Sequence, residues 1–140
     1  MEEDRIHLQI ATVGGPVYDD RVWAIQLPLE DGYLGVMANH APLLCAVVEG
    51  VVRATKADGT SHYIAVTHGL AHVADNHVSV LVNAAELAEK IDLARAQAAE
   101  QRARERLRKH DAPDIDMVRA EAALHRALAR QMAVRMMKRK

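Results

Sequence analysis

The chain has 140 residues, 50% of them hydrophobic, with a formal net charge of -1, which fits one globular core and excludes a disordered chain. Its single cysteine, Cys45, excludes an internal disulfide framework and favours a reducing compartment. The acidic start MEEDR does not resemble a secretory signal, and no apolar run approaches the roughly 20 residues that span a bilayer, so we expect membrane association only through partners.

The first half of the chain has the period-two alternation of strands with one buried face. In IHLQIATV, Ile6, Leu8 and Ile10 alternate with more polar residues. VWAIQLPL predicts a second strand, whose end Pro28 would place at a sheet edge. Further short strands follow between tight turns: YLGVM, LLCAVV, VVRATKA, HYIAVT, LAHVA and VSVLVNA. This pattern predicts an antiparallel β-sandwich or flattened barrel over residues 1–88, with a two-residue hairpin turn at Asp58 and Gly59.

The second half of the chain changes to a helical pattern. From Glu86 onward there is no glycine, and Pro113 is the only proline. We predict an antiparallel two-helix hairpin within residues 89–140, with helices over about 92–109 and about 116–136 and the turn at HDAPD. The predicted apolar stripes are Leu93, Ala96, Ala99, Ala103 and Leu107 on the first helix, and Met117, Ala120, Leu124, Ala127, Leu128 and Val134 on the second.

These stripes consist mostly of alanine, and this predicts how firmly the hairpin packs. A buried methyl contributes only about 0.8 kcal/mol, against about 1.5 to 3 kcal/mol for a leucine or methionine side chain. We therefore expect a hairpin with high helix propensity but weak docking, which could detach without unfolding.

Charge divides the chain at the same place. Residues 1–88 carry four Lys and Arg against eleven Asp and Glu, a net of -7, whereas residues 89–140 carry fourteen against eight, a net of +6. A basic segment of this kind can lie on its own acidic body or bind another acidic surface.

Four segments, in order and spacing, resemble the ε subunit of bacterial F-type ATP synthases. They are DGYLGVMANHAPLL, EGVVR, VLVNAAELAEKIDLARAQAA and RAEAALHRALAR, so the resemblance covers nearly the whole chain. It implies a noncatalytic rotor part at the cytoplasmic face of the bacterial plasma membrane. The sandwich would bind the γ subunit and the ring of c subunits, and would couple ion-driven rotation to ATP synthesis in the catalytic head.

The resemblance also implies a regulatory role for the helices. When extended along γ, their basic face would meet a catalytic β subunit of the α/β head and inhibit ATP hydrolysis. The residues that would supply this charge are Arg102, Arg104, Arg106, Arg108, Arg126, Arg130, Arg135 and Lys138. The alternative interpretation is that these side chains form an ordinary solvated helix face.

The loop LEDGYLG is expected to face the c ring. Its residues are Glu30, Asp31, Gly32, Tyr33, Leu34 and Gly35. Three features depart from the family pattern. Tyr33 replaces a frequent acidic residue, Met37-Ala38 replaces a commoner leucine-proline, and His68 stands where glycine or serine is usual.

Some family members bind ATP on the folded hairpin as a regulatory ligand rather than a cofactor. The matching positions here are Glu86, Asp92, Arg95, Arg126 and Arg130. Arg126 and Arg130 are four residues apart and so share a helix face. The arginines would bind phosphates, while the two carboxylates would accept from an adenine amino group or orient the arginines.

A plainer explanation of IDLARA at residues 91–96 competes with the nucleotide site. IDMVRA at residues 115–120 repeats the pattern, so Asp92 and Asp116 could both be helix N-caps, each worth about 1 kcal/mol. The repeat leaves Arg126 and Arg130 unexplained.

Other chemistry has less support. His68, His72 and His77 are close in sequence, but in a strand pattern we interpret them as surface or turn histidines, and no metal site is predicted. Ser61 and Ser79 lack a nucleophile context and there is no Gly-rich phosphate loop, so we do not expect an enzyme. A second hypothesis, a nucleic-acid-binding module using the basic hairpin, is opposed by the -7 body and by 3% aromatic residues.

Overall fold

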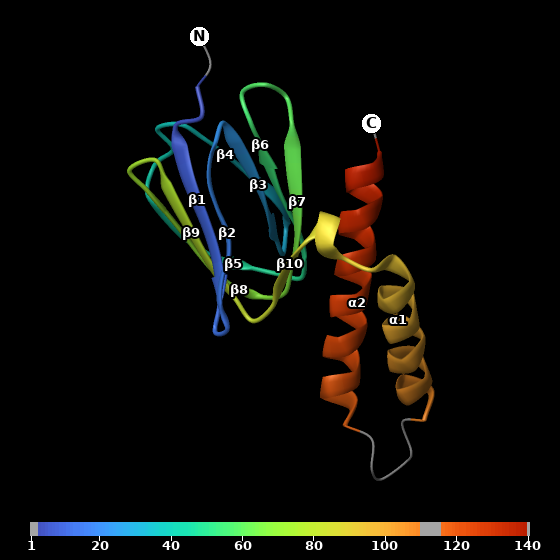
Figure 1. Cartoon of the computed structure of the whole chain (residues 1–140). Helices are drawn as coiled ribbons and strands as arrows, with labels where there is room; N and C mark the ends of the chain where they lie inside the picture. Colours follow the sequence, from blue (N-terminus) through green and yellow to red (C-terminus); the bar gives the residue numbers. More distant parts are fainter. Residues whose placement is uncertain (1–2, 110–115, 140) are drawn as a thin grey trace.

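The computed structural model describes residues 3–109 and 116–139 and shows a β-sandwich beside a helical hairpin (Figure 1). Sheet A has the strand order β2-β1-β9-β8-β5, and sheet B has the order β10-β7-β6-β3-β4. The strands are β1 (Ile6–Thr12), β2 (Gly15–Val22), β3 (Ala24–Leu29), β4 (Gly32–Met37), β5 (Leu43–Val47), β6 (Gly50–Thr55), β7 (Ser61–Val66), β8 (Gly69–Ala74), β9 (His77–Val82) and β10 (Ala85–Leu87). The predicted fold class is confirmed, although β1 and β9 pair in parallel.

The sandwich core consists of branched aliphatic side chains from both sheets. Ile6, Leu8 and Ile10 of β1 are at most 1% exposed, as their alternation predicted. From sheet B, Leu27 and Ile64 pack into the same cluster and are fully buried. Large side chains on alternating positions therefore fix the register of the strands, because a slip by one residue would turn the whole set outward.

The sequence pattern missed two strands, β2 and β10. In β2, Tyr18 and Val22 are buried, but Asp19, Asp20 and Arg21 lie between them on an edge strand, which hides the hydrophobic signal. β10 has only three residues, too few to show a period.

Two local predictions in the sandwich were wrong. The turn between β6 and β7 is longer than two residues, because Lys56 N–H donates to the Thr60 carbonyl and, of the two turn residues, only Gly59 has a positive φ. Pro28 lies in β3, an interior strand, rather than at a sheet edge. It is tolerated because β3 pairs with β6 only from Ala24 to Gln26, so no ladder bond on that side needs its missing N–H.

The helices begin and end close to the predicted positions. A 3-10 turn, η1 (Ala88–Lys90), leads into α1 (Leu93–Arg108), and α2 (Met117–Lys138) follows. The predicted turn HDAPD lies outside the described residues. Within the described part of the chain, neither helix is long and apolar enough to cross a membrane.

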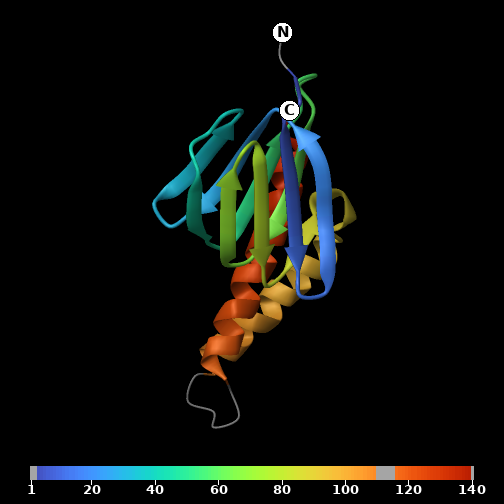
Figure 2. The ribbon, with the colours of Figure 1, turned by 90° about the vertical axis from the view of Figure 1, so that its left-hand side faces the viewer.

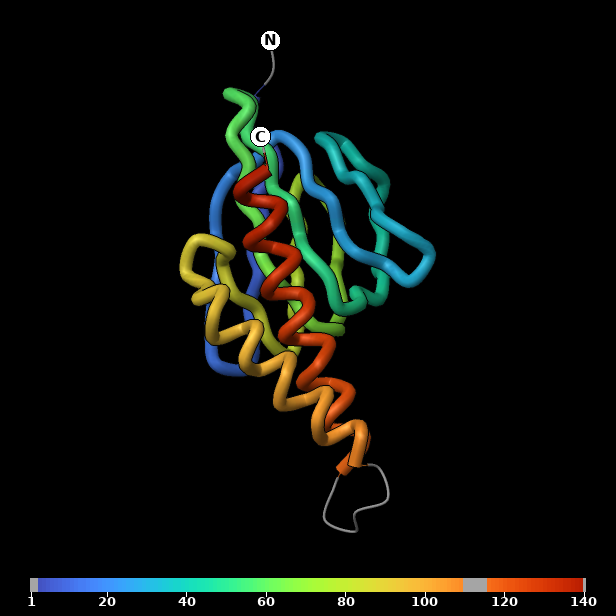
Figure 3. The backbone as a smooth tube through the Cα atoms, turned by 90° about the vertical axis from the view of Figure 1, so that its right-hand side faces the viewer, coloured from blue at the N-terminus to red at the C-terminus, as the bar shows by residue number. Residues whose placement is uncertain are grey.

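Helix α2 lies between α1 and sheet B (Figure 1), and both helices lie on the same side of the sandwich (Figure 3). Its predicted stripe contains the buried Ala120, Ala127 and Val134, as expected for a contact with α1. A second buried face, which the stripe did not include, packs Ala129 and Ala133 against Val51 and Ala65 of sheet B, with Ala88 of η1 beside them. The buried part of this contact on α2 thus consists of alanine, and the partly buried Met136 and Met137 pack beside it.

Candidate functional site

The junction between the sandwich and the hairpin contains a pocket of about 210 Å³ built from four elements. Glu86 comes from β10, Asp92 and Arg95 from the start of α1, and Arg130 from α2. Lys90, Ile91 and Ala96 complete the lining. The structure therefore brings together four of the five residues predicted to bind a nucleotide, from segments more than thirty residues apart in the chain.

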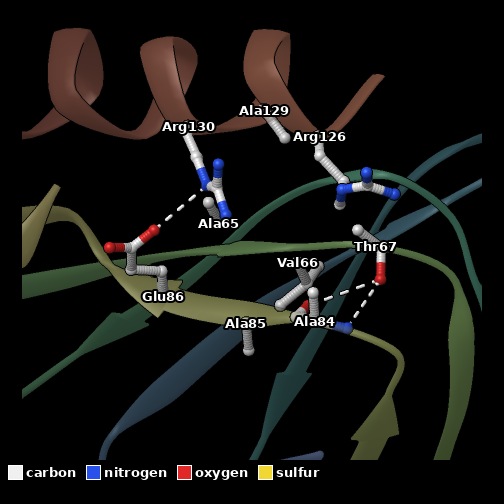
Figure 4. A pocket seen from close by; sticks show the side chains of 9 residues that line it. All are labelled: Ala65, Val66, Thr67, Ala84, Ala85, Glu86, Arg126, Ala129 and Arg130. Carbon is white, nitrogen blue, oxygen red and sulfur yellow. Dashed lines mark hydrogen bonds and ion pairs between the residues drawn. The ribbon is translucent and has the colours of Figure 1, made fainter. Parts of the chain in front are cut away.

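The fifth predicted residue, Arg126, lies at an adjoining cavity of about 30 Å³, which has room for little more than water. Glu86 and Arg130 line both spaces. Figure 4 shows Arg126 and Arg130 reaching from α2 toward the sheet, with Arg126 near Thr67 and Arg130 directed at Glu86. The five predicted residues thus surround one junction.

An ion pair joins the sandwich to the hairpin at this junction. Arg130 Nε lies 3.1 Å from Glu86 Oε1, and each side chain is 38% exposed (Figure 4). At that exposure the pair contributes about 0 to 1 kcal/mol. The contact is therefore weak enough for an anionic ligand to displace the Glu86 carboxylate.

The sandwich side of the small cavity is held by a buried hydroxyl. Thr67 Oγ1 accepts a hydrogen bond from Ala84 N–H at 2.8 Å and donates to the Ala84 carbonyl at 3.4 Å. Thr67 is 6% exposed. Sequence reasoning did not find Thr67 or Lys90; Lys90 could have been noticed as a cation directly before the IDLARA segment.

Both aspartates of the repeated IDLARA pattern are helix N-caps. Asp92 accepts from the backbone N–H of Arg95 at 3.1 Å, and Asp116 accepts from that of Arg119 at 3.2 Å. The plainer explanation is confirmed for the aspartates. It does not explain the guanidinium of Arg95, because the cap uses only the backbone N–H of that residue. The Arg95 side chain lines the junction pocket instead.

The arginines predicted as an inhibitory surface do not form one continuous face. At about 100° per residue, Arg102 and Arg106 lie on one side of the buried Ala103, and Arg104 and Arg108 lie on the other. On α2, Arg126 and Arg130 are half-buried between the two packed faces, whereas Arg135 and Lys138 are exposed. In the folded hairpin these charges are therefore distributed over several surfaces.

The predicted ring-facing loop is shorter than expected. Glu30 and Asp31 form the turn, while Gly32, with φ of 129°, begins β4. Tyr33, Leu34 and Gly35 belong to that edge strand, and Tyr33 is 53% exposed.

Sheet A lies on the side of the sandwich away from the helices (Figure 2), and its outer face carries exposed apolar side chains. Leu70 of β8 and Leu81 of β9 are directly paired and are 55% and 58% exposed, and Leu44 of the adjacent β5 is 64% exposed. In β9, Val80 and Val82 point into the core, so the intervening Leu81 must point outward. A leucine at an outward position of this alternation is the sequence feature that indicates the patch.

The three histidines considered for a metal site lie around the hairpin of β8 and β9. His68 Nδ1 contacts Glu49 at 3.1 Å, and its Nε2 contacts Asn83 at 2.9 Å. His77 Nε2 contacts Gln9 at 2.6 Å. His68 is not in a positive-φ conformation, so its replacement of a smaller residue does not strain the turn.

Comparison with known proteins gives a consistent result over most of the chain. Residues 5–88 match the family described as ATP synthase, Delta/Epsilon chain, beta-sandwich domain, and residues 89–134 match its long alpha-helix domain. The ATP synthase epsilon chain of Macrococcus caseolyticus is 43% identical over 128 residues, which are 91% of this chain and 94% of that protein. That of Bacillus licheniformis is 41% identical over 125 residues, covering 89% and 94%.

The fold is also found in a solved structure. A chain in the Euglena gracilis mitochondrial ATP synthase structure, which contains OSCP, F1 and the c ring, superposes with a TM-score of 0.72. The match covers 89% of this chain and 78% of that chain at 23% identity.

Proposed function

The chain belongs to the delta/epsilon family of ATP synthase as a noncatalytic epsilon chain, and from this premise we propose that it couples rotation to ATP synthesis and restrains ATP hydrolysis. In this proposal residues 1–88 are the coupling domain and residues 89–140 the regulatory domain. The chain acts at the cytoplasmic face of the plasma membrane and contacts the membrane only through the complex.

The coupling role is assigned to the sandwich. The apolar patch of Leu44, Leu70 and Leu81 is a surface that a protein partner can cover, and we assign it to the γ subunit. The turn at Glu30 and Asp31, with the exposed Tyr33 next to it, is assigned to the c ring.

The regulatory role is assigned to the hairpin. Helices packed through alanine can separate at low cost, and the arginines that are now divided among several surfaces would then be free to meet an acidic segment of a catalytic subunit. This state is the inhibitory one.

We further propose that ATP binds at the junction and favours the folded hairpin. The observation that supports this is the junction pocket, whose residues come from the sandwich, the linker and both helices. A ligand bound there contacts all of these parts, so it stabilises only the conformation in which they meet. The volume of about 210 Å³ is below the usual range for a whole ligand, so the nucleotide must extend along the surface or displace the Glu86 to Arg130 contact.

Calorimetric titration of ATP into the full chain tests this site. The junction variant is Arg126→Ala with Arg130→Ala, and both arginines lie in the interior of α2. The matched control is Arg119→Ala with Arg139→Ala, two exposed arginines in the first turn of α2 and at its C-cap. We expect binding in the wild type and the control and loss of binding in the junction variant. No binding at millimolar ATP, or equal loss in both variants, would contradict the nucleotide site.

The nucleic-acid alternative is tested by DNA binding at two salt concentrations. Our proposal expects weak association and retained affinity for a γ subunit. Tight, salt-sensitive binding without affinity for γ would favour the alternative.

A further inference from the structure

Helix α2 buries one polar side chain, Gln131, in its contact with α1. Gln131 is 2% exposed and lies on the same face as Ala120, Ala127 and Val134. Together with Thr67 it is one of two buried polar residues in the described part of the chain, and Thr67 is satisfied locally by Ala84. Gln131 instead finds its partner on the other helix.

The partner of Gln131 is Glu100 of α1. Gln131 Nε2 donates to Glu100 Oε1 at 2.7 Å, and Arg104 Nε donates to Glu100 Oε2 at the same distance. Arg135 donates to Gln131 Oε1 at 3.3 Å. Both oxygens of Glu100 and both ends of the Gln131 amide are therefore used in one network.

This network links the two helices at a position where the apolar packing is thin. Among described residues, the bond from Gln131 to Glu100 is the one side-chain hydrogen bond between α1 and α2. The surrounding contacts include the methyl groups of Ala96, Ala103 and Ala127, which are nondirectional and tolerate sliding. A buried amide left without its partner pays its full desolvation cost, so it penalises a displaced register more strongly than the loss of any single methyl contact.

The network also includes two arginines that, in the proposed function, bind a catalytic subunit when the hairpin is extended. Arg104 and Arg135 both belong to the proposed inhibitory surface, and in the folded chain they donate to Glu100 and Gln131 respectively. Because Glu100 and Gln131 lie on different helices, separation of α1 from α2 must break the network. Arg130 and Gln131 are consecutive residues of α2. Arg130 contacts Glu86 of the sandwich, and Gln131 contacts Glu100 of α1.

We propose that Glu100 and Gln131 form a latch that fixes the register of the folded hairpin and holds Arg104 and Arg135 in intramolecular contacts until the helices separate. This inference rests on the proposed opening of the hairpin, but it concerns residues outside the junction pocket. The latch acts through donor and acceptor complementarity, which a substitution can reverse without changing side-chain size.

The test is the distance between α1 and α2 in the full chain without nucleotide. Spin labels are placed at Ala98→Cys and Met132→Cys, both on exposed positions, in a Cys45→Ala background, and pulsed electron paramagnetic resonance gives the fraction of separated helices. Gln131→Glu places a second carboxylate against Glu100, and Gln97→Glu, on the exposed side of α1, is the matched control.

We expect Gln131→Glu to raise the ratio of separated to packed helices by about tenfold, while Gln97→Glu leaves it unchanged. The exchanged pair, Glu100→Gln with Gln131→Glu, restores one donor and one acceptor and should return the ratio to the wild-type value. Equal opening in Gln131→Glu and its control, or failure of the exchanged pair to restore packing, would overturn the latch.

The rescue also guards against simple misfolding, because a variant that loses helix structure for another reason would not recover in the exchanged pair. Failure of the latch is distinguishable from failure of the proposed function. ATP binding is measured separately by calorimetry, and the distance measurement requires neither ATP nor the assembled complex.

Discussion

The sandwich and the hairpin of this chain are held by different kinds of contact. The sandwich core contains Ile6, Leu8, Leu27 and Ile64 at 1% exposure or less, whereas the second cluster, which joins the hairpin to the sheet, contains Ala88, Ala129 and Ala133. A buried leucine contributes about 1.5 to 3 kcal/mol and a methyl about 0.8 kcal/mol. The sandwich therefore has the stronger apolar packing, and the weaker packing of the hairpin is what supports our proposal that it separates.

The largest expected effect comes from the sandwich core. Leu27→Ala removes a fully buried side chain and should lower the free energy of unfolding by about 2 to 5 kcal/mol. Urea unfolding followed by fluorescence of Trp23, the single tryptophan, measures it. As a control on the hairpin, Ala127→Gly should leave the Trp23 transition nearly unchanged, and an equal shift would remove the distinction between the two parts.

Deletion of residues 89–140 should lower the free energy of unfolding of the sandwich by less than Leu27→Ala does. It exposes Val51 and Ala65 of sheet B, together with Ala88 and the packed part of Tyr63, a loss of about 1 to 2 kcal/mol in the same Trp23 assay. In the assembled complex the deletion should preserve assembly and raise ATPase activity. A truncated chain that unfolds, or a complex that fails to assemble, would show that the hairpin is not a separate regulatory part.

The features predicted from the sequence are those that depend on local pattern. The alternation of IHLQIATV and the alanine-rich stripes indicated the two parts, and Asp92 and Asp116 were identified as possible N-caps. The five predicted junction residues do surround one site, because the resemblance supplied their positions.

The features that escaped prediction depend on how distant elements meet. The second buried face of α2, with Ala129 and Ala133, becomes visible only when the helix is docked on sheet B. The partner of Gln131 is fixed by the relative register of α1 and α2, which neither helix sequence contains. β2 escaped detection because an edge strand needs only one buried face and carries charge on the other.

A smaller effect is expected from the ion pair that connects the two parts. Glu86→Gln removes the partner of Arg130 and should weaken docking of the hairpin by at most about 1 kcal/mol at low salt, and by less at high salt. Thermal unfolding followed by helix circular dichroism at two salt concentrations measures the change. Glu89→Gln, on the exposed side of η1, serves as the control, and an equal effect there would argue against a specific contact.

The smallest expected effect is the pH dependence of the latch. The hydrogen bond from Gln131, and next that from Arg104, lower the pKa of Glu100. A lowered pKa gives stability that is present above the unfolded value of about 4.3 and is lost as pH falls through the folded pKa. The spin-label distance should therefore show more separated helices below about pH 4 in the wild type. Glu100→Gln should show a flatter profile, and identical profiles would mean that Glu100 does not contribute.

Native-state amide hydrogen exchange of the full chain, with and without ATP, tests the central claim most directly, because it compares both parts in one sample. We predict that amides of α1 and α2 exchange through an opening that costs less free energy than that of β6 and β7, and that ATP slows exchange in the helices alone. Equal opening free energies for α2 and β7, unchanged by ATP, would contradict a separable hairpin that a nucleotide holds closed.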